Sequence, residues 1–259
     1  MKLNIVPART GFQWVKLGAQ TFLRQPLAMA GLSFMSTATI TVLSLVPVIG
    51  PLLSVALIPA ISLGLMAASR EAQQGRFPMP TTLVTAFRAG PANTRAMLIL
   101  GGMYTAAVLL VVNLGALFAT EVAPVVGASS GEVTPEQVRA MFDNPGLWVT
   151  MLLSLPVLMA FWHAPALVHW HRVTPLKSLF FSLMACWANK GAMLLYGVGW
   201  MGVLMATAVV MNLLAVVLGS AALLNLVVFP MALLLAAMFQ ASIWFTVRDS
   251  FVTEEGPAA

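Results

Sequence analysis

Three histidines lie close together in the second half of the chain, and imidazoles suit proton transfer or metal binding. At 100° per residue of a regular helix, His169 lies about 240° around the axis from His163, and His171 about 80° from it. Three rings spread this widely cannot reach one ion, so we expect no metal site. His163 lies roughly two turns inside its apolar segment. It is expected either to bind a proton or ligand, or to fill a hydrogen-bonded packing position.

Asparagines supply the other polar groups within the apolar segments. Asn113, Asn212 and Asn225 each lie a few turns from one end of such a segment. They could form a polar cluster that lines a path, or they could make hydrogen bonds between helices. None of the eight Asp and Glu residues falls inside an apolar segment, which weakens an interpretation as an ion-coupled transporter.

Signatures of nucleotide binding and hydrolysis are missing from the sequence. It contains no G-x-x-x-x-G-K-[ST], no G-x-S-x-G and no H-E-x-x-H. We therefore expect no catalytic residues, no cofactor and no enzymatic activity. Cys186 is the single cysteine, which excludes an intramolecular disulfide, and it is expected to be a small buried hydrophobic residue.

Composition indicates the kind of protein that must position these groups. The chain has 259 residues, of which 60% are hydrophobic and only 8% charged, with a mean hydropathy of +0.93. So few charges cannot cover a water-soluble globule, for which about 25% charged residues are typical. We expect a single all-α domain, 1–259, that forms a polytopic transmembrane bundle. Its six spans are predicted at about 27–46, 50–69, 96–118, 146–170, 192–218 and 222–247.

Charge predicts the orientation of the bundle. Twelve of the thirteen Lys and Arg residues fall on one side of these spans, whereas Arg139 lies on the other side, within an acidic loop at 119–145. The positive-inside rule places both termini in the cytoplasm of a bacterium and this loop outside its inner membrane. Membrane topology and attraction to anionic lipids explain the high isoelectric point, so no nucleic acid is expected as a partner.

An amphipathic stretch precedes each pair of spans on the cytoplasmic side. These stretches contain Trp14, Phe87 and Phe180, respectively, and we expect them to be helices lying in the membrane interface. The order of interfacial helix and hairpin occurs three times, which predicts three repeats. The alternative is that any six-span protein carries charged inner loops. The basic residues expected to contact lipid head groups are Arg24, Arg88, Arg95 and Lys190.

The remaining segments are short. Thr134 and Pro135 are typical of a helix start, which predicts a helix to about Phe142 in the external loop. Trp148 and Trp170 bracket the fourth span and are expected to anchor it at the two interfaces. The C-terminal residues 248–259 are expected to form a solvated tail.

Two segments, 8–31 and 161–197, resemble the BPSS-type family of uncharacterised bacterial inner-membrane proteins. The residues that carry the resemblance are Arg24, Gln25 and Pro26 in the first segment, and Ala164, Pro165, Ala166, Leu167, Pro175, Leu176, Ser182 and Asn189 in the second. The resemblance implies a six-helix inner-membrane protein without an assigned biochemical activity. It transfers no catalytic residues to this chain.

Three functional hypotheses follow from the sequence. The first is a non-enzymatic protein whose basic interfacial helices bind membrane lipids, a membrane-protein partner or a second copy of the chain. The second is a small-molecule transporter or channel with a path lined by the three asparagines and His163. The third is an accessory subunit of a membrane complex, recognised through the external loop.

Overall fold

Six long apolar helices dominate the computed structural model, which describes residues 2–120, 135–218 and 221–252. Each is long and apolar enough to cross a membrane, so the predicted six-span, all-α architecture is confirmed. The third begins five residues before the predicted start, because Pro91 suits the first turn of a helix. Their bounds are α2 Pro26–Ser44, α3 Ile49–Gln73, α5 Pro91–Leu117, α7 Pro145–Trp162 continued by α8 Ala164–Trp170, α10 Lys190–Leu218 and α11 Ala221–Ser250.

Shorter elements connect or precede these helices. The helix predicted in the external loop is confirmed as α6, although Thr134 lies outside the described residues. The short elements are β1 Lys2–Leu3, α1 Thr10–Arg24, the 3-10 turn η1 Pro80–Val84, α4 Thr85–Arg88, α6 Pro135–Phe142, α9 Pro175–Ala188 and β2 Phe251–Val252.

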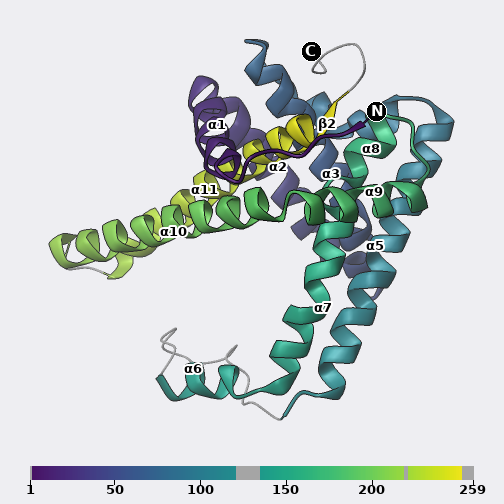
Figure 1. The fold of residues 1–259 in the computed structure, drawn as a ribbon. Coiled ribbons are helices and arrows are strands. Elements are labelled where there is room, and N and C mark those ends of the chain that lie inside the picture. Colours follow the sequence, from purple (N-terminus) through teal and green to yellow (C-terminus); the bar gives the residue numbers. More distant parts are fainter. Residues whose placement is uncertain (1, 121–134, 219–220, 253–259) are drawn as a thin grey trace.

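The long helices form three hairpins. The first hairpin is α2 and α3, the second is α5 with α7 and α8, and the third is α10 and α11. Helix α3 packs against α5 of the second hairpin, and α11 packs against both helices of the first. The second and third hairpins diverge away from the end of the molecule where the termini lie (Figure 1). We call that end the junction end, and the opposite end, which carries α6, the far end.

Apart from α6, which lies within the second hairpin, each short helical segment contacts the hairpin that precedes it when the chain is treated as a circle, and α4 also contacts α5 of the hairpin that follows. Helix α1 lies against α10 and α11, η1 and α4 lie against α3, and α9 lies against α7 and α8. This cyclic order is what three equivalent units would produce. The repeat itself stays a prediction, since packing order alone does not establish common origin.

Helix α1 is a wedge between α10 and α11 rather than a helix lying only in the interface. Its buried face includes Gly11, Trp14, Gly18 and Phe22, and the Trp14 side chain is 0% exposed. A Cβ atom added at Gly11 would overlap the backbone of α10, and one added at Gly18 would overlap Ser242 of α11. The two glycines therefore permit a close approach that any side chain would prevent.

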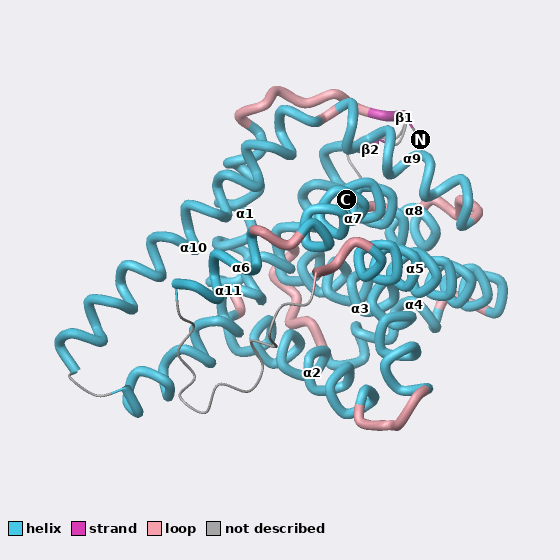
Figure 2. Tube along the Cα trace, turned by 90° about the horizontal axis from the view of Figure 1, so that it is seen from below, coloured by secondary structure: helices cyan, strands magenta, loops and turns pink. Residues whose placement is uncertain are grey.

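The two ends of the chain pair with each other. Strand β1 is antiparallel to β2, with Lys2 opposite Val252 and Leu3 opposite Phe251 (Figure 2). Residues Arg248 to Ser250 finish α11, and Phe251 is buried. The prediction of a solvated tail beginning at 248 is therefore wrong as far as Val252, because the N-terminal strand supplies backbone partners. Residues 253–259 lie outside the described part of the chain.

Candidate functional site

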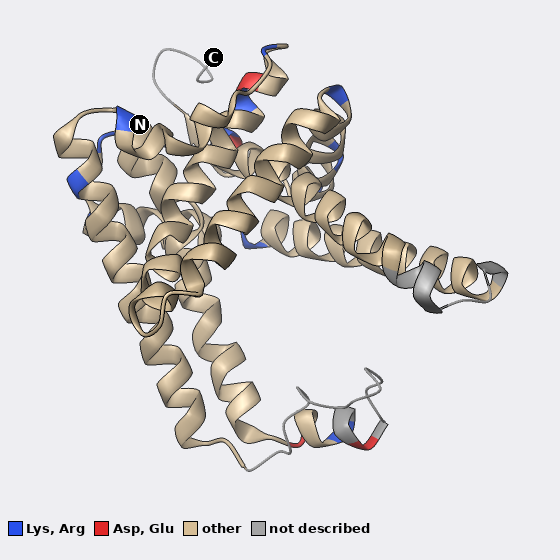
Figure 3. Ribbon diagram, turned by 180° about the vertical axis from the view of Figure 1, so that it is seen from behind, with Lys and Arg blue, Asp and Glu red and all other residues tan. Residues whose placement is uncertain are grey.

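The basic residues expected to contact lipid are all exposed at or near the junction end. Figure 3 shows Lys and Arg concentrated towards the end that carries the termini, and the charges of α6 at the far end. The Arg24 guanidinium also donates to the Gln73 carbonyl oxygen at 3.1 Å. Arg88 ends α4, and Arg95 lies inside α5. These four residues come from three different parts of the chain and share one end of the molecule.

Exposed hydrophobic side chains stand beside two of these cations. Leu23, adjacent to Arg24, is 66% exposed, and Trp187 is 62% exposed. The ammonium group of Lys190 lies 5.3 Å from the centroid of the Trp187 ring, which is within the range of a cation–π interaction. A cation beside a half-exposed aromatic ring is the arrangement expected where head groups meet acyl chains.

The structure does not bring Asn113 and Asn212 together with His163. Asn113 and Asn212 are exposed, and each donates to the carbonyl oxygen four residues earlier in its own helix. They lie on the second and third hairpins, which diverge (Figure 1). The side chain of Asn225 lies outside the described residues. A path lined jointly by Asn113, Asn212 and His163 therefore does not exist in the described structure.

His163 lies at a break in the fourth span, between α7 and α8, where its side chain is fully buried. The Ser182 hydroxyl of α9 accepts from the His163 backbone N–H at 2.9 Å and donates to the Met159 carbonyl oxygen at 2.7 Å. The hydroxyl thus bridges two groups that a continuous helix would bond directly. Pro165, which cannot sit in a helix interior without cost, accounts for the break.

Cys186 is buried, as predicted, and it belongs to the same cluster. Its sulfur lies 3.6 Å from His163 Nδ1 and 3.6 Å from the Met159 carbonyl oxygen. Burial raises the pKa of the Cys186 thiol to about 12, so the group is protonated at neutral pH. A cysteine beside a histidine can form a nucleophilic pair, but a protonated thiol and a fully buried ring favour packing instead.

The other two histidines have different neighbours. His169 Nδ1 lies 3.1 Å from Asn93 Nδ2, which also donates to the Ala86 carbonyl oxygen and so ties α4 to α5. His171 packs beside Phe251, and burial lowers its pKa. Among the described residues, no three His, Cys, Asp or Glu side chains converge on a possible metal ion.

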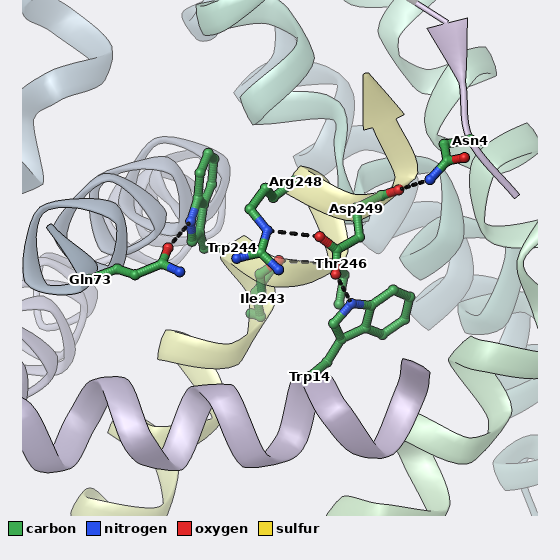
Figure 4. Close-up of polar contacts among 8 residues, drawn as sticks. All are labelled: Asn4, Trp14, Gln73, Ile243, Trp244, Thr246, Arg248 and Asp249. Atoms are coloured by element: carbon green, nitrogen blue, oxygen red, sulfur yellow. Dashed lines mark hydrogen bonds and ion pairs between the residues drawn. The ribbon is translucent and has the colours of Figure 1, made fainter. Parts of the chain in front are cut away.

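A polar network joins the N-terminal segment, α1 and the end of α11 at the junction end (Figure 4). The Trp14 indole N–H donates to Asp249 Oδ2 at 2.8 Å, and Arg248 Nε lies 2.7 Å from Asp249 Oδ1. Asn4 Nδ2 donates to the Asp249 backbone oxygen at 2.8 Å. Because one carboxylate accepts from two elements, it fixes the end of α11 against α1.

Two tryptophans and an arginine join the three hairpins beside this network. The rings of Trp170 and Trp244 lie 4.9 Å apart, centroid to centroid. The guanidinium carbon of Arg70 lies 6.0 Å from the Trp170 ring centroid and 5.8 Å from that of Trp244. The indole N–H of Trp244 donates to Gln73 Oε1 at 3.3 Å (Figure 4). Trp170 thus packs within the protein as well as marking the end of its span.

A pocket of about 180 Å³ lies at the same place, and we call it the junction pocket. It is formed by the ends of α3 and α11, one from each of two hairpins, and by the residues around the end of α8 in the remaining hairpin. Its lining residues are Arg70, Trp170, His171, Trp244, Val247, Arg248 and Phe251. Sequence reasoning missed this pocket, although Arg70, Trp170 and Arg248 all stand where the second span of a hairpin ends.

A second, larger cavity of about 340 Å³ lies between α2, α3 and α11. Its walls are mainly aliphatic, with polar groups from Ser36, Thr37, Ser62 and Gln240. Gln240 Oε1 also accepts from the Ser33 hydroxyl at 2.8 Å, which ties α11 to α2. Each of these residues lies well inside a predicted span, so this cavity lies at membrane depth.

The fold and the composition define a multi-pass helical membrane protein. The chain is 36% identical to the "Probable inner membrane protein BTH_II0599" of Burkholderia thailandensis, over 98% of this chain and 96% of that protein. The chain belongs to the family of that inner-membrane protein, as the resemblance implied. No family model and no solved structure matches the chain.

Proposed function

We propose that this inner-membrane protein is a non-enzymatic, lipid- or partner-binding protein whose junction end faces the cytoplasm. The observation that supports the proposal is the set of four exposed cations, Arg24, Arg88, Arg95 and Lys190, gathered towards one end of the molecule. Exposed Leu23 and Trp187 beside them suit the boundary between head groups and acyl chains. Anionic lipids are concentrated in the cytoplasmic leaflet and attract each nearby basic residue by about 1 kcal/mol.

The test compares lipid selectivity between the native protein and a variant without these charges. Arg24→Gln, Arg88→Gln, Arg95→Gln and Lys190→Gln are combined, and Arg139→Gln at the far end is the matched control. Native mass spectrometry of nanodiscs with equal phosphatidylglycerol and phosphatidylcholine reads the retained lipids. The preference for phosphatidylglycerol is expected to fall roughly tenfold or more in the combined variant and to stay unchanged in the control. If the combined variant and the Arg139→Gln control showed the same preference for phosphatidylglycerol, the lipid-binding proposal would be refuted.

Small-molecule transport is the second candidate, and the cavity between α2, α3 and α11 is the observation that favours it. Polar groups within an aliphatic wall at membrane depth are typical of substrate sites. Proteoliposomes loaded with mixed amino acids, sugars and organic acids would release a solute through the native protein, and Gln240→Leu would slow this release. Equal release from protein-free liposomes would exclude this function.

Recognition of a partner subunit through the external loop stays a prediction, because residues 121–134 lie outside the described part.

A further inference from the structure

The cavity between α2, α3 and α11 places hydrogen-bonding groups deep in the membrane. Thr37, Ser62 and Gln240 each come from a different one of these helices. Each lies about ten residues, or ~15 Å, from the junction end of its helix. This depth is near the middle of a hydrocarbon core of ~30 Å. Polar side chains at such a depth are rare and commonly mark a binding site or a path for a ligand.

Gln240 has a donor that the protein does not use. Its Oε1 atom accepts from the Ser33 hydroxyl at 2.8 Å, which fixes the orientation of the amide. The amide nitrogen carries two N–H donors and has no hydrogen-bond partner among the described residues. A ligand oxygen is therefore the group that this side chain can bind.

The opposite wall supplies acceptors. The hydroxyl groups of Ser36 and Thr37 both donate to the Ser33 carbonyl oxygen, at 2.8 and 3.0 Å. Each hydroxyl oxygen keeps lone pairs that can accept a hydrogen bond. A ligand hydroxyl is both a donor and an acceptor, so it can pair with Gln240 on one side and with α2 on the other.

The charge of the lining restricts the ligand further. None of the described residues that line this cavity is Asp, Glu, Lys, Arg or His. A charged ligand group would lose its hydration here without gaining a counter-charge, which is costly at membrane depth. The ligand must therefore be uncharged.

The entrance of the cavity lies on a surface that faces lipid. Thr37 and Ala236 are exposed, whereas Ser36 and Leu65 are buried. The exposed pair belongs to α2 and α11, so a molecule can enter sideways between these two helices. A volume of about 340 Å³ falls within the range of ~300–1,000 Å³ that is typical of small-molecule sites.

We propose that this cavity binds one uncharged lipid through a free hydroxyl group, which pairs with the Gln240 amide nitrogen and with a hydroxyl oxygen of α2. The acyl chains of the lipid leave the cavity past Thr37 and Ala236. This inference rests on the cavity that favours the transport candidate and names the class of its ligand. It is independent of the four surface cations, since none of them lines the cavity.

The experiment compares three lipids that share the same acyl chains. Dioctanoylglycerol carries the free hydroxyl, its acetyl ester blocks the hydroxyl, and dioctanoylphosphatidic acid replaces the hydroxyl by a charged phosphate. Each is added to the full chain in neutral detergent micelles, and native mass spectrometry reads the number of lipids retained. The native protein is expected to retain one dioctanoylglycerol per chain and to retain the acetyl ester roughly fivefold less well, because one hydrogen-bonding group is lost.

Two variants test the place of binding. Gln240→Leu is expected to lower the retention of dioctanoylglycerol roughly fivefold. Ala236→Leu keeps every polar group but places a larger side chain at the entrance, and it is expected to lower this retention roughly tenfold or more. It serves where Gln240→Leu fails to fold, since the Gln240 bond to Ser33 remains. Ala232→Leu is the matched control, because Ala232 is exposed one turn earlier on α11 and does not line this cavity.

Separate results distinguish this inference from the proposed functions. The combined variant without Arg24, Arg88, Arg95 and Lys190 is expected to retain dioctanoylglycerol, and Ala236→Leu is expected to keep the preference for phosphatidylglycerol. Release of a water-soluble solute from proteoliposomes by Ala236→Leu as fast as by the native protein would leave transport standing and assign it to another path.

Three results would overturn the inference. Equal retention of dioctanoylglycerol by Ala236→Leu and Ala232→Leu would show that the lipid binds elsewhere. Equal retention of the acetyl ester and dioctanoylglycerol by the native protein would show that the hydroxyl is not recognised. Equal losses of dioctanoylglycerol and dioctanoylphosphatidic acid in Ala236→Leu would show that the cavity does not select an uncharged ligand.

Discussion

The junction end and the outer parts of the second and third hairpins differ in what surrounds their side chains. Half of the most apolar window of α3 is buried inside the protein, compared with 11% of that of α10. At the junction end, α1 packs between α10 and α11. The hydrogen bond from the Trp14 indole to the Asp249 carboxylate joins α1 to the end of α11. Away from it, α10 presents residues such as Met205 and Leu213 outward. Protein contacts therefore hold the junction end, whereas lipid must surround the diverging helices.

The largest expected contrast comes from removing the same side chain in the two regions. Leu63 of α3 is 0% exposed, whereas Leu213 of α10 is 62% exposed. Leu63→Ala is expected to destabilise the protein by about 2–3 kcal/mol, near the lower end for buried leucines, because lipid also solvates leucine well. Leu213→Ala is expected to change the stability by less than about 0.5 kcal/mol. Unfolding in mixed micelles measures both, and equal losses would contradict the contrast.

The second contrast tests the close approach of α1. Gly18→Ala places a Cβ atom against Ser242 of α11, and overpacking of this kind costs about 1–3 kcal/mol. Gly197→Ala in α10 meets no atom within 4 Å and is expected to be neutral or slightly stabilising, since alanine favours a helix. Melting temperatures of the two purified variants provide the measurement. A Gly18→Ala protein as stable as the native one would show that α1 can shift without cost.

The third contrast removes one indole donor from each region. Trp14→Phe breaks the bond to Asp249 and is expected to cost about 1–2 kcal/mol. Trp148→Phe at the far end removes a bond to the Phe142 carbonyl oxygen, but Trp148 is exposed and the expected cost is below about 0.5 kcal/mol. Thermal melts compare the stability of the two variants. A greater loss of stability in Trp148→Phe than in Trp14→Phe would contradict the expectation that protein contacts hold the junction end more firmly than the far end.

The smallest effect concerns accessibility rather than stability. Cys186 is buried and its pKa is raised to about 12, so the folded protein is expected to resist a membrane-impermeant maleimide at pH 8. A cysteine introduced by Ala119→Cys in a Cys186→Ala background is exposed beyond the end of α5 and is expected to react from outside intact spheroplasts. If Ala119→Cys were labelled only after the cells are opened, the proposed orientation of the protein in the membrane would be wrong.

The sequence predicted those features that depend on composition and local pattern. Six apolar segments longer than a bilayer is thick must form helices, because no water is present to satisfy an exposed backbone. The helix beginning at Pro135 and the burial of Cys186 also followed from local signals. The observed helix ends differ from the predicted ones by several residues. The helix α5 begins at Pro91 rather than at about 96, because a proline can start a helix earlier than hydropathy indicates.

Contacts between distant segments required the tertiary structure. The pairing of β1 with β2 joins residues near the two ends of the chain, and a run of two residues is too short to indicate a strand from the sequence. Gly11, Trp14 and Gly18 form one face of α1, and this spacing could have indicated a packed helix rather than an interfacial one. For the junction pocket, the sequence indicated only that Arg70, Trp170 and Arg248 stand at equivalent span ends, and not that these ends of three hairpins meet.

The sequence by itself thus determined a six-helix inner-membrane protein with its basic residues on one side, because bilayer thickness and charge constrain each segment separately. Only the tertiary structure decided that Arg70, Trp170 and Arg248 meet in one pocket, that Asn113 and Asn212 are exposed while His163 is buried, and that α1 wedges between two helices. The physical reason is that helices in lipid associate through close packing and hydrogen bonds, and these depend on which surfaces meet rather than on hydropathy.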